Sequence, residues 1–298
     1  MIRVSYTNFW SDPTNDRYLS NFINKNIEDI VEVHPLNNPD IIFFSCFGDI
    51  SLAKKLKAKC KIFYYGENPD RYEPYNNFDK LKQYFDLIIG FRPSYNDSSV
   101  IRFPLWLMYY NTYNINDFNN IVDHIEREYF KNKYINKKYF ATIVAKKSST
   151  KPSRNIIYKE MSKHGDVIAP KGLIFGNENI ERPKNVSEKI NFIKNSLYNI
   201  CPENSSYPGY CTEKVFQALE AGTIPVYWGS SNPESKIINE NKYCFTDINN
   251  QGRLTSSITN SINNPEKHTE KKVFKAQAKE NIQGMYDNLK KSILNNIQ

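Results

Sequence analysis

At 298 residues, of which 40% are hydrophobic, the chain is long enough for two domains with hydrophobic cores. No apolar run approaches the roughly 20 residues of a membrane-spanning helix, and residues 1–13 lack the basic start and apolar stretch of a signal peptide, so we expect a soluble, cytoplasmic protein. The formal net charge of +8 is spread along the chain and no nucleic-acid-binding module is present, so we expect general solubility with one locally positive phosphate site, and no nucleic-acid partner.

The first part of the chain alternates short apolar runs with candidate helices. The alternation predicts a parallel sheet with helices on both faces. Strands are predicted at Ile2–Tyr6, Ile30–His34, Ile41–Phe44, Lys61–Tyr65, Leu87–Gly90 and Val100–Phe103. Helices are predicted at Tyr18–Asn26, Ile50–Lys57 and Phe78–Phe85.

A candidate functional carboxylate follows the fourth of these strands. In a parallel sheet, binding residues collect just past the carboxyl ends of the strands. The segment Gly66-Glu67-Asn68-Pro69 occupies that position after Lys61–Tyr65. Glu67 is therefore a candidate for catalysis, and the alternative is a turn glutamate in water.

An aromatic cluster and a lysine-rich run close the first half. Trp106, Tyr109 and Tyr110 are suited either to stacking on sugars or to packing a domain interface. A helix is predicted at Ile115–Phe130, and the polar run Lys131–Lys138 after it marks the predicted boundary between a domain of residues 1–138 and a domain of residues 139–298.

The second half opens with a predicted strand at Tyr139–Ala145 and a polar loop that leads into a helix ending near His164. The first turn of a helix offers free backbone N–H groups to an anion. Arg154 lies in that turn, and its planar guanidinium suits a pair of oxygens. The alternative is a surface arginine.

The segment from Cys201 to Gly229 predicts a loop, a helix and a strand that follow the apolar strand Leu197–Ile200. Thr212 is a suitable N-cap and Gly222 a suitable C-terminal residue. Glu213 and Lys214 would then lie in the first helical turn, where an anion is stabilised. The alternative is that both are ordinary solvated residues.

After this segment we expect a strand at Tyr243–Phe245 and helices at Arg253–Asn263 and Glu266–Ile297. The last helix has few apolar positions, so a packed or solvated helix is favoured, and weak peripheral association with an anionic membrane stays open. Five scattered cysteines form no metal-binding pattern and are expected to be buried free thiols: Cys46, Cys60, Cys201, Cys211 and Cys244.

Three parts of the central segment resemble the donor-binding motif of the α-1,3/1,4-fucosyltransferases, glycosyltransferase family 10. They are Glu203-Asn204-Ser205-Ser206, Tyr210-Cys211-Thr212-Glu213-Lys214 and Ala221–Gly229. Gly66-Glu67-Asn68 and Arg154 are also similar to positions of this family. The resemblance covers roughly Gly66 to Pro233. It implies an α/β fold of GT-B type, in which two Rossmann-like domains face a central cleft, with residues 1–138 on the acceptor side and residues 139–298 binding GDP-fucose. The last helix is expected to pack back on the first domain.

The resemblance also implies the activity. It implies transfer of L-fucose from GDP-fucose to a hydroxyl of an N-acetylglucosamine-containing glycan, with inversion and with an α-1,3 linkage favoured. Glu67 is the implied catalytic base. The implied donor-binding residues are Arg154 and Lys214 at the pyrophosphate, Glu213 at the ribose hydroxyls, and Asn204 and Tyr210 at the phosphates or the fucose. No Asp-x-Asp triplet is present, so we expect no required metal and no cofactor beyond the donor.

Two alternatives stay open from the residues themselves. One is a related glycosyltransferase that uses another nucleotide sugar. The other is a non-catalytic module that holds glycans or nucleic acid through Lys131–Lys138 and its aromatic residues.

Overall fold

The computed structural model describes residues 1–10, 17–92, 97–110, 112–113, 117–133, 135–146, 152–177 and 179–297. Contacts divide the chain into two compact units, and the first consists of Met1–Ile121, Pro208–Tyr210 and Lys279–Gln298. The second consists of Val122–Tyr207 and Cys211–Ala278. This division groups residues by their contacts and does not test where one folding domain ends and the next begins. The domain boundary between residues 138 and 139 stays a prediction.

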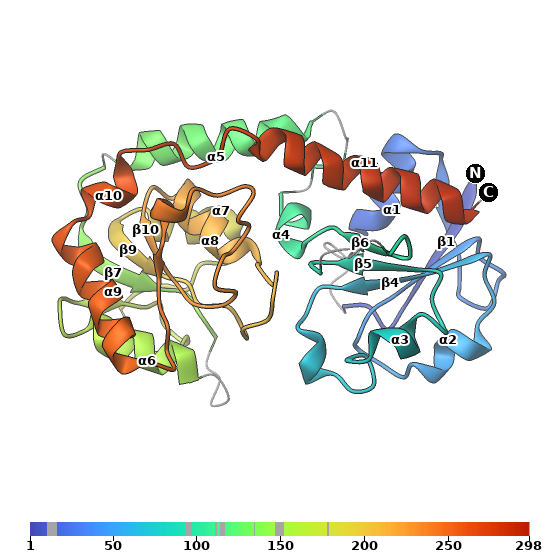
Figure 1. The fold of residues 1–298 in the computed structure, drawn as a ribbon, viewed down its shortest axis with the longest axis horizontal. Helices are drawn as coiled ribbons and strands as arrows, with labels where there is room; N and C mark the ends of the chain where they lie inside the picture. Colours follow the sequence, from blue (N-terminus) through green and yellow to red (C-terminus); the bar gives the residue numbers. More distant parts are fainter. Residues whose placement is uncertain are drawn as a thin grey trace. The chain divides into compact units, whose positions relative to one another are not determined.

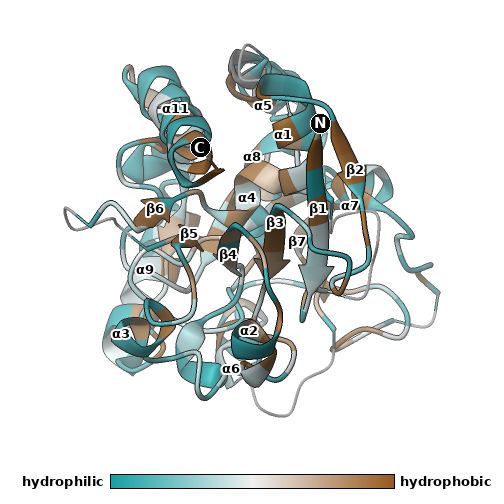
Figure 2. Ribbon diagram, turned by 90° about the vertical axis from the view of Figure 1, so that its right-hand side faces the viewer, coloured by the Kyte–Doolittle hydropathy of each residue, from teal (hydrophilic) through white to brown (hydrophobic). Residues whose placement is uncertain are grey.

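Among the described residues, the first unit contains a six-stranded sheet in the order β2-β1-β3-β4-β5-β6, with every pair parallel (Figure 1). All four residues of β3 are buried, and the strand is drawn in brown along its length in Figure 2. Burial on both faces is typical of a strand covered by helices on each side. The strands are β1 (Ile2–Thr7), β2 (Ile30–Glu32), β3 (Ile41–Phe44), β4 (Cys60–Tyr65), β5 (Leu87–Gly90) and β6 (Val100–Arg102).

The helices that belong to this unit are short, apart from the last. They are α1 (Tyr18–Asn26), α2 (Ser51–Lys55), the 3-10 turn η1 (Pro69–Arg71), α3 (Phe78–Leu81), α4 (Leu105–Met108) and, from Lys279 on, α11 (Ala278–Ile297). The helix predicted to reach Phe85 is shorter than expected. Beyond Leu81 the chain forms turns that lead into β5, and just before that strand the Asp86 carboxylate accepts a hydrogen bond of 2.7 Å from the backbone N of Lys61.

Trp106 is wholly buried in α4, so its ring is part of the core and is not available to a sugar. Its burial excludes stacking on a sugar for this residue, and packing at a domain interface stays a prediction.

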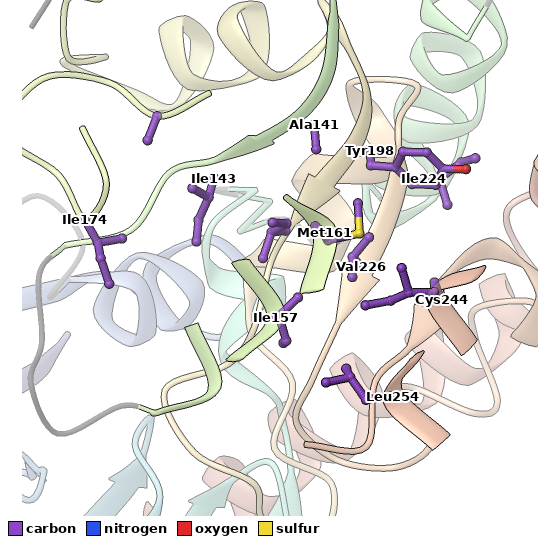
Figure 3. Close-up of a cluster of buried hydrophobic side chains, with 13 residues drawn as sticks. Ala141, Ile143, Ile157, Met161, Ile174, Tyr198, Ile224, Val226, Cys244 and Leu254 are labelled. Carbon is purple, nitrogen blue, oxygen red and sulfur yellow. The ribbon is translucent and has the colours of Figure 1, made fainter. Parts of the chain in front are cut away.

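The second unit contains, in the part of it that is described, a five-stranded parallel sheet in the order β11-β10-β9-β7-β8. Side chains of strands and of α6 and α9 form its core, shown in Figure 3. The strands are β7 (Tyr139–Ile143), β8 (Val167–Ile168), β9 (Ser196–Ile200), β10 (Ile224–Tyr227) and β11 (Cys244–Phe245). The helices are α5 (Phe118–Asn132, from Val122 on), α6 (Pro152–Met161), α7 (Val186–Ile193), α8 (Glu213–Glu220), η2 (Glu240–Lys242), α9 (Gln251–Asn263) and α10 (Glu266–Thr269).

The single helix predicted over Glu266–Ile297 is wrong, because α10 and α11 are separated by an extended segment. Phe274 bridges to Ile238, and the backbone N–H groups of Val273 and Phe274 donate to the carboxylate of Glu126 at 3.2 and 3.3 Å. Val273 and Phe274 are both buried. These contacts stabilise the extended conformation over a continuous helix.

Helix α11 buries its apolar residues in the first unit. Ile282, Tyr286, Leu289 and Ile293 recur at helical spacing and are inaccessible to solvent, and the Tyr286 hydroxyl lies 3.1 Å from that of Tyr18. In the described ranges, no helix combines the length and hydropathy that a membrane crossing requires. All five cysteines are buried free thiols, as predicted.

Candidate functional site

Glu203 is a wholly buried carboxylate just past the end of β9. Its Oε1 accepts a hydrogen bond from the backbone N of Thr212 at 2.7 Å, and its Oε2 accepts from Thr212 Oγ1 at 2.7 Å and from Lys214 Nζ at 2.9 Å. A buried charge is tolerated when it is paired and hydrogen-bonded in this way. Glu203 therefore joins the loop after β9 to the start of α8.

Helix α8 begins after Thr212, as the sequence predicts, but the Thr212 side chain does not cap the helix. Thr212 has the extended backbone of an N-cap residue, but its hydroxyl makes no capping hydrogen bond to the helix and binds Glu203 instead. At the other end Gly222 has a φ of 66°, and a Cβ there would lie 2.4 Å from the backbone N of Lys133. Glycine is therefore required both by the backbone and by the close approach of the neighbouring chain.

The first turn of α8 carries Glu213 and Lys214, as predicted. Lys214 Nζ lies 3.8 Å from Glu213 Oε1, and Glu213 is buried. Burial favours the neutral form of this carboxyl, but the ammonium groups of Lys214 and Lys189 outweigh it, so the pKa of Glu213 is lowered. Glu213 is thus held as an anion beside two cations.

Lys189 is the second cation beside Glu213, and the sequence did not indicate it. It lies on α7, which packs on α8, and its Nζ donates a 2.7 Å hydrogen bond to Gln217 Oε1. Burial lowers the pKa of this lysine. No local motif marks it, because only the packing of the two helices brings it to Glu213.

Arg154 is a buried guanidinium at the start of α6. Its Nη1 donates to the carbonyl of Lys146 at 2.5 Å and its Nη2 to Asn204 Oδ1 at 3.1 Å, so two of the predicted donor-binding residues are in contact. Burial lowers the pKa of Arg154, and the negative charge of Glu203 opposes that effect. In the described ranges no carboxylate forms an ion pair with Arg154.

Unsatisfied polar atoms accompany this arginine. Among the described residues, Arg154 Nε, Ser153 Oγ and Ser205 Oγ are buried and have no hydrogen-bond partner. Buried polar groups are normally paired, and an unpaired one calls for an explanation. A buried cation with unpaired donors around it fits an anionic ligand rich in oxygen atoms.

Glu67 lies in the first unit, just past the end of β4, as predicted. Its Oε2 accepts from Arg71 Nη1 and from the hydroxyl of Tyr210, both at 3.4 Å. The following residue, Asn68, caps η1 by accepting from the backbone N of Asp70 at 3.0 Å, which shapes the turn that holds Glu67. The Glu67 side chain is 18% exposed and is therefore within reach of a ligand.

The six predicted residues fall into two groups. Arg154, Asn204, Glu213 and Lys214 belong to the second unit, around Glu203. Tyr210 belongs by its contacts to the first unit, where its ring packs edge-on against Phe91 and its hydroxyl reaches Glu67. The roles given to these residues stay predictions.

The described side chains include no group of three or more His, Cys, Asp or Glu arranged to hold a metal ion. Independence from a metal stays a prediction.

Comparisons with known proteins agree with these observations. Residues 4–109 match a family model described as the N-terminal domain of alpha-(1,3)-fucosyltransferase FucT, and residues 134–283 match the C-terminal model of glycosyltransferase family 10 (fucosyltransferase). The chain is 24% identical over 271 residues to alpha-(1,3)-fucosyltransferase FucT of Helicobacter pylori. That match covers 79% of this chain and 53% of the relative, so the chain spans about half the length of that protein.

Solved structures show the same fold. A crystal structure of an α1,3-fucosyltransferase with GDP-fucose is similar with a TM-score of 0.66 at 19% identity, over 97% of this chain and 90% of the other. The corresponding structure with GDP has a TM-score of 0.65 at 19% identity, over 97% and 89%. The predicted α/β fold of GT-B type is confirmed.

Proposed function

Since the chain belongs to glycosyltransferase family 10, the fucosyltransferases, we propose that it transfers L-fucose from GDP-fucose to a hydroxyl of an N-acetylglucosamine-containing glycan, with inversion and an α-1,3 linkage. The relative from Helicobacter pylori is named an alpha-(1,3)-fucosyltransferase, and the similar crystal structure contains GDP-fucose. Both support the choice of donor and linkage.

The observation that carries the proposal is the buried cation Arg154, whose Nε has no hydrogen-bond partner among the described residues. As the bond between fucose and GDP breaks, negative charge develops on the pyrophosphate and must be stabilised by fixed donors. Arg154 offers Nε, and Lys214 lies in the first turn of α8, where backbone N–H groups and the helix dipole also favour an anion. These groups are held in place before the donor binds, because Asn204 and Glu203 already contact them.

Glu203 adjusts the charge of this site as well as its geometry. Its carboxylate forms an ion pair with the partly exposed ammonium group of Lys214. A pyrophosphate that approaches Lys214 therefore shares that cation with Glu203, and Arg154 supplies the positive charge that has no such partner among the described residues. We assign Glu203 a positioning role and the direct phosphate contact to Arg154 and Lys214.

The acceptor hydroxyl must lose a proton as it attacks the anomeric carbon, and Glu67 is the proposed base. Both hydrogen bonds that it accepts from the described residues are to Oε2, which leaves Oε1 to receive the proton. An inverting displacement needs the base and the leaving group on opposite faces of the sugar. Glu67 belongs to the first unit of the chain and the proposed phosphate-binding cations belong to the second.

A panel of nucleotides tests the donor. A ligand that binds the native state raises the midpoint of thermal unfolding, so GDP and GDP-fucose should do so while UDP and dTDP should not. Transfer to N-acetyllactosamine, detected by mass spectrometry, then tests the reaction. Stabilisation by UDP or dTDP would instead favour a glycosyltransferase with another donor, and no stabilisation by any nucleotide would contradict the proposal.

A further inference from the structure

Three neighbouring strands of the first unit end beside Glu67, and two of them are followed by aromatic residues. β1, β3 and β4 are adjacent and parallel, so their carboxyl ends lie at one edge of the sheet. Trp10 follows β1, Phe47 follows β3 and Glu67 follows β4. Ligands of open parallel sheets bind at this edge.

Contacts connect these residues in a series that begins at Gly66 and ends at the carboxylate of Glu67. The Trp10 and Phe47 ring centroids are 5.1 Å apart, and those of Phe47 and Tyr72 are 5.6 Å apart. The Arg71 guanidinium lies over Tyr72, 5.6 Å from its centroid, and also donates to Glu67. At the other end the indole of Trp10 packs so closely on Gly66 that a Cβ there would lie 2.3 Å from its ring.

The loops that carry these aromatic residues are held together by polar contacts. Asn8 has a φ of 57°, and its Nδ2 donates to the carbonyl of Asp49 at 2.9 Å. The Asn8 side chain fills the space where a Cβ of Gly48 would lie, and the Tyr75 hydroxyl donates to the Gly48 carbonyl at 2.7 Å. A left-handed asparagine at this point costs energy and needs such support. Residues 8–10, which directly follow β1, and the loop after β3 therefore present a defined surface.

The three aromatic side chains remain accessible. Phe47 is 39% exposed, and Trp10 and Tyr72 are half-buried. In the described residues Phe47 is the one aromatic among the exposed large hydrophobic side chains. A cluster of this kind that borders a catalytic carboxylate, rather than filling the core, is typical of a binding surface.

We propose that Trp10, Phe47 and Tyr72, here called the aromatic platform, bind a pyranose ring of the acceptor glycan and place its hydroxyl at Glu67. The assignment rests on the proposed function, which supplies the role of Glu67. The C–H face of a pyranose is apolar and packs on aromatic rings, while its hydroxyls need polar partners. Glu67 and Arg71 supply these at the border of the platform.

Phe47→Ala is the main test, because an exposed side chain can be removed with little effect on the fold. Binding of N-acetyllactosamine is measured in the presence of GDP by saturation-transfer NMR, and steady-state kinetics give KM for acceptor and donor separately. We expect the variant to weaken acceptor binding and to raise the acceptor KM about tenfold, with GDP affinity and the donor KM unchanged. Tyr72→Ala should act in the same direction, and Trp10→Phe should retain most of the binding.

Tyr84→Ala is the matched control, because Tyr84 is also a half-buried aromatic residue of the first unit but contacts Phe85 and Lys54 instead of the platform. It should leave both KM values unchanged. Unchanged glycan affinity in both Phe47→Ala and Tyr72→Ala would overturn the platform, as would a native protein that binds GDP but no glycan. Failure to bind GDP would contradict the proposed donor instead. In that case, glycan affinity measured without GDP for the native protein and the variants would still show whether the platform binds the acceptor.

Discussion

The Nζ of Lys214 donates a 2.9 Å hydrogen bond to Oε2 of Glu203, a carboxylate with no exposure to solvent. The same carboxylate also accepts the backbone N–H and the hydroxyl of Thr212. A side chain from the loop after β9 thus fixes both the first turn of α8 and the cation that it carries. Stability and the proposed binding of the donor are therefore expected to be coupled at this point.

Glu203→Ala should destabilise the protein by about 3–5 kcal/mol, because it removes the buried carboxylate that accepts from the Lys214 ammonium group and from the Thr212 N–H. Glu203→Gln keeps the shape and one acceptor oxygen, so it should cost less. Urea unfolding of both variants measures the difference. The exposed Glu181→Ala is the control and should stay within about 0.5 kcal/mol of the native protein. A Glu203→Ala variant as stable as the control would contradict the account of this ion pair.

Arg154→Ala should weaken GDP binding by about 1.5–3 kcal/mol, the usual worth of a hydrogen bond to a charged group. Arg154→Lys should recover only part of this, because lysine lacks the planar fork. Titration calorimetry with GDP measures both. Arg253 is a suitable control, since it is likewise the third residue of a helix, α9, but is 76% exposed. Equal GDP affinity in the Arg154→Ala and Arg253→Ala variants would remove Arg154 from the donor site.

Glu67→Gln should lower kcat about 10²–10⁴-fold, the usual contribution of a general base, since the amide cannot accept the proton of the acceptor hydroxyl. GDP affinity should not change, because Glu67 is not among the residues proposed to bind the phosphates. Asp70→Asn, an exposed carboxylate three residues further on, is the control and should keep full activity. Substantial kcat in Glu67→Gln would mean that another group takes the proton.

The lowered pKa of Glu213 predicts a dependence of stability on pH. The folded protein holds this carboxyl below its ordinary pKa of 4.5, so the unfolded chain binds the proton more readily. The resulting stabilisation is complete above pH 4.5 and is lost as the pH falls through the folded pKa. The gap in unfolding free energy between the native protein and Glu213→Gln should therefore be largest near neutral pH and narrow in acid. A gap that does not change with pH would contradict this.

Turnover should persist after treatment with EDTA, since cationic side chains rather than a divalent ion are proposed to stabilise the leaving pyrophosphate. The measurement is product formation before and after chelation, with the thermal midpoint as a check on folding. Loss of activity that Mn²⁺ or Mg²⁺ restores would replace this expectation with a metal-dependent mechanism.

Several features were determined by the sequence alone. The apolar runs are the strands of two parallel sheets, and the turn after Tyr65 places Glu67 at the end of β4. Helix α8 ends before Gly222 because glycine accepts the left-handed backbone found there. Such features depend on residues close together in the chain, so the spacing of apolar side chains and the conformational preferences of single residues are enough to predict them.

Other features were decided only by the tertiary structure. Trp106 and Phe47 are both aromatic residues just past a strand, but one is wholly buried and the other is 39% exposed. Lys189 reaches Glu213 only because α7 packs on α8, and the break before α11 depends on the Glu126 carboxylate of a distant helix. Whether a side chain is buried, and which group it pairs with, depends on which residues far apart in sequence become neighbours when the helices pack on the sheets. The local sequence pattern does not indicate which distant residue will become a neighbour. The grouping of Lys189 and Lys214 around Glu213 and the aromatic platform could therefore be recognised only in the folded chain.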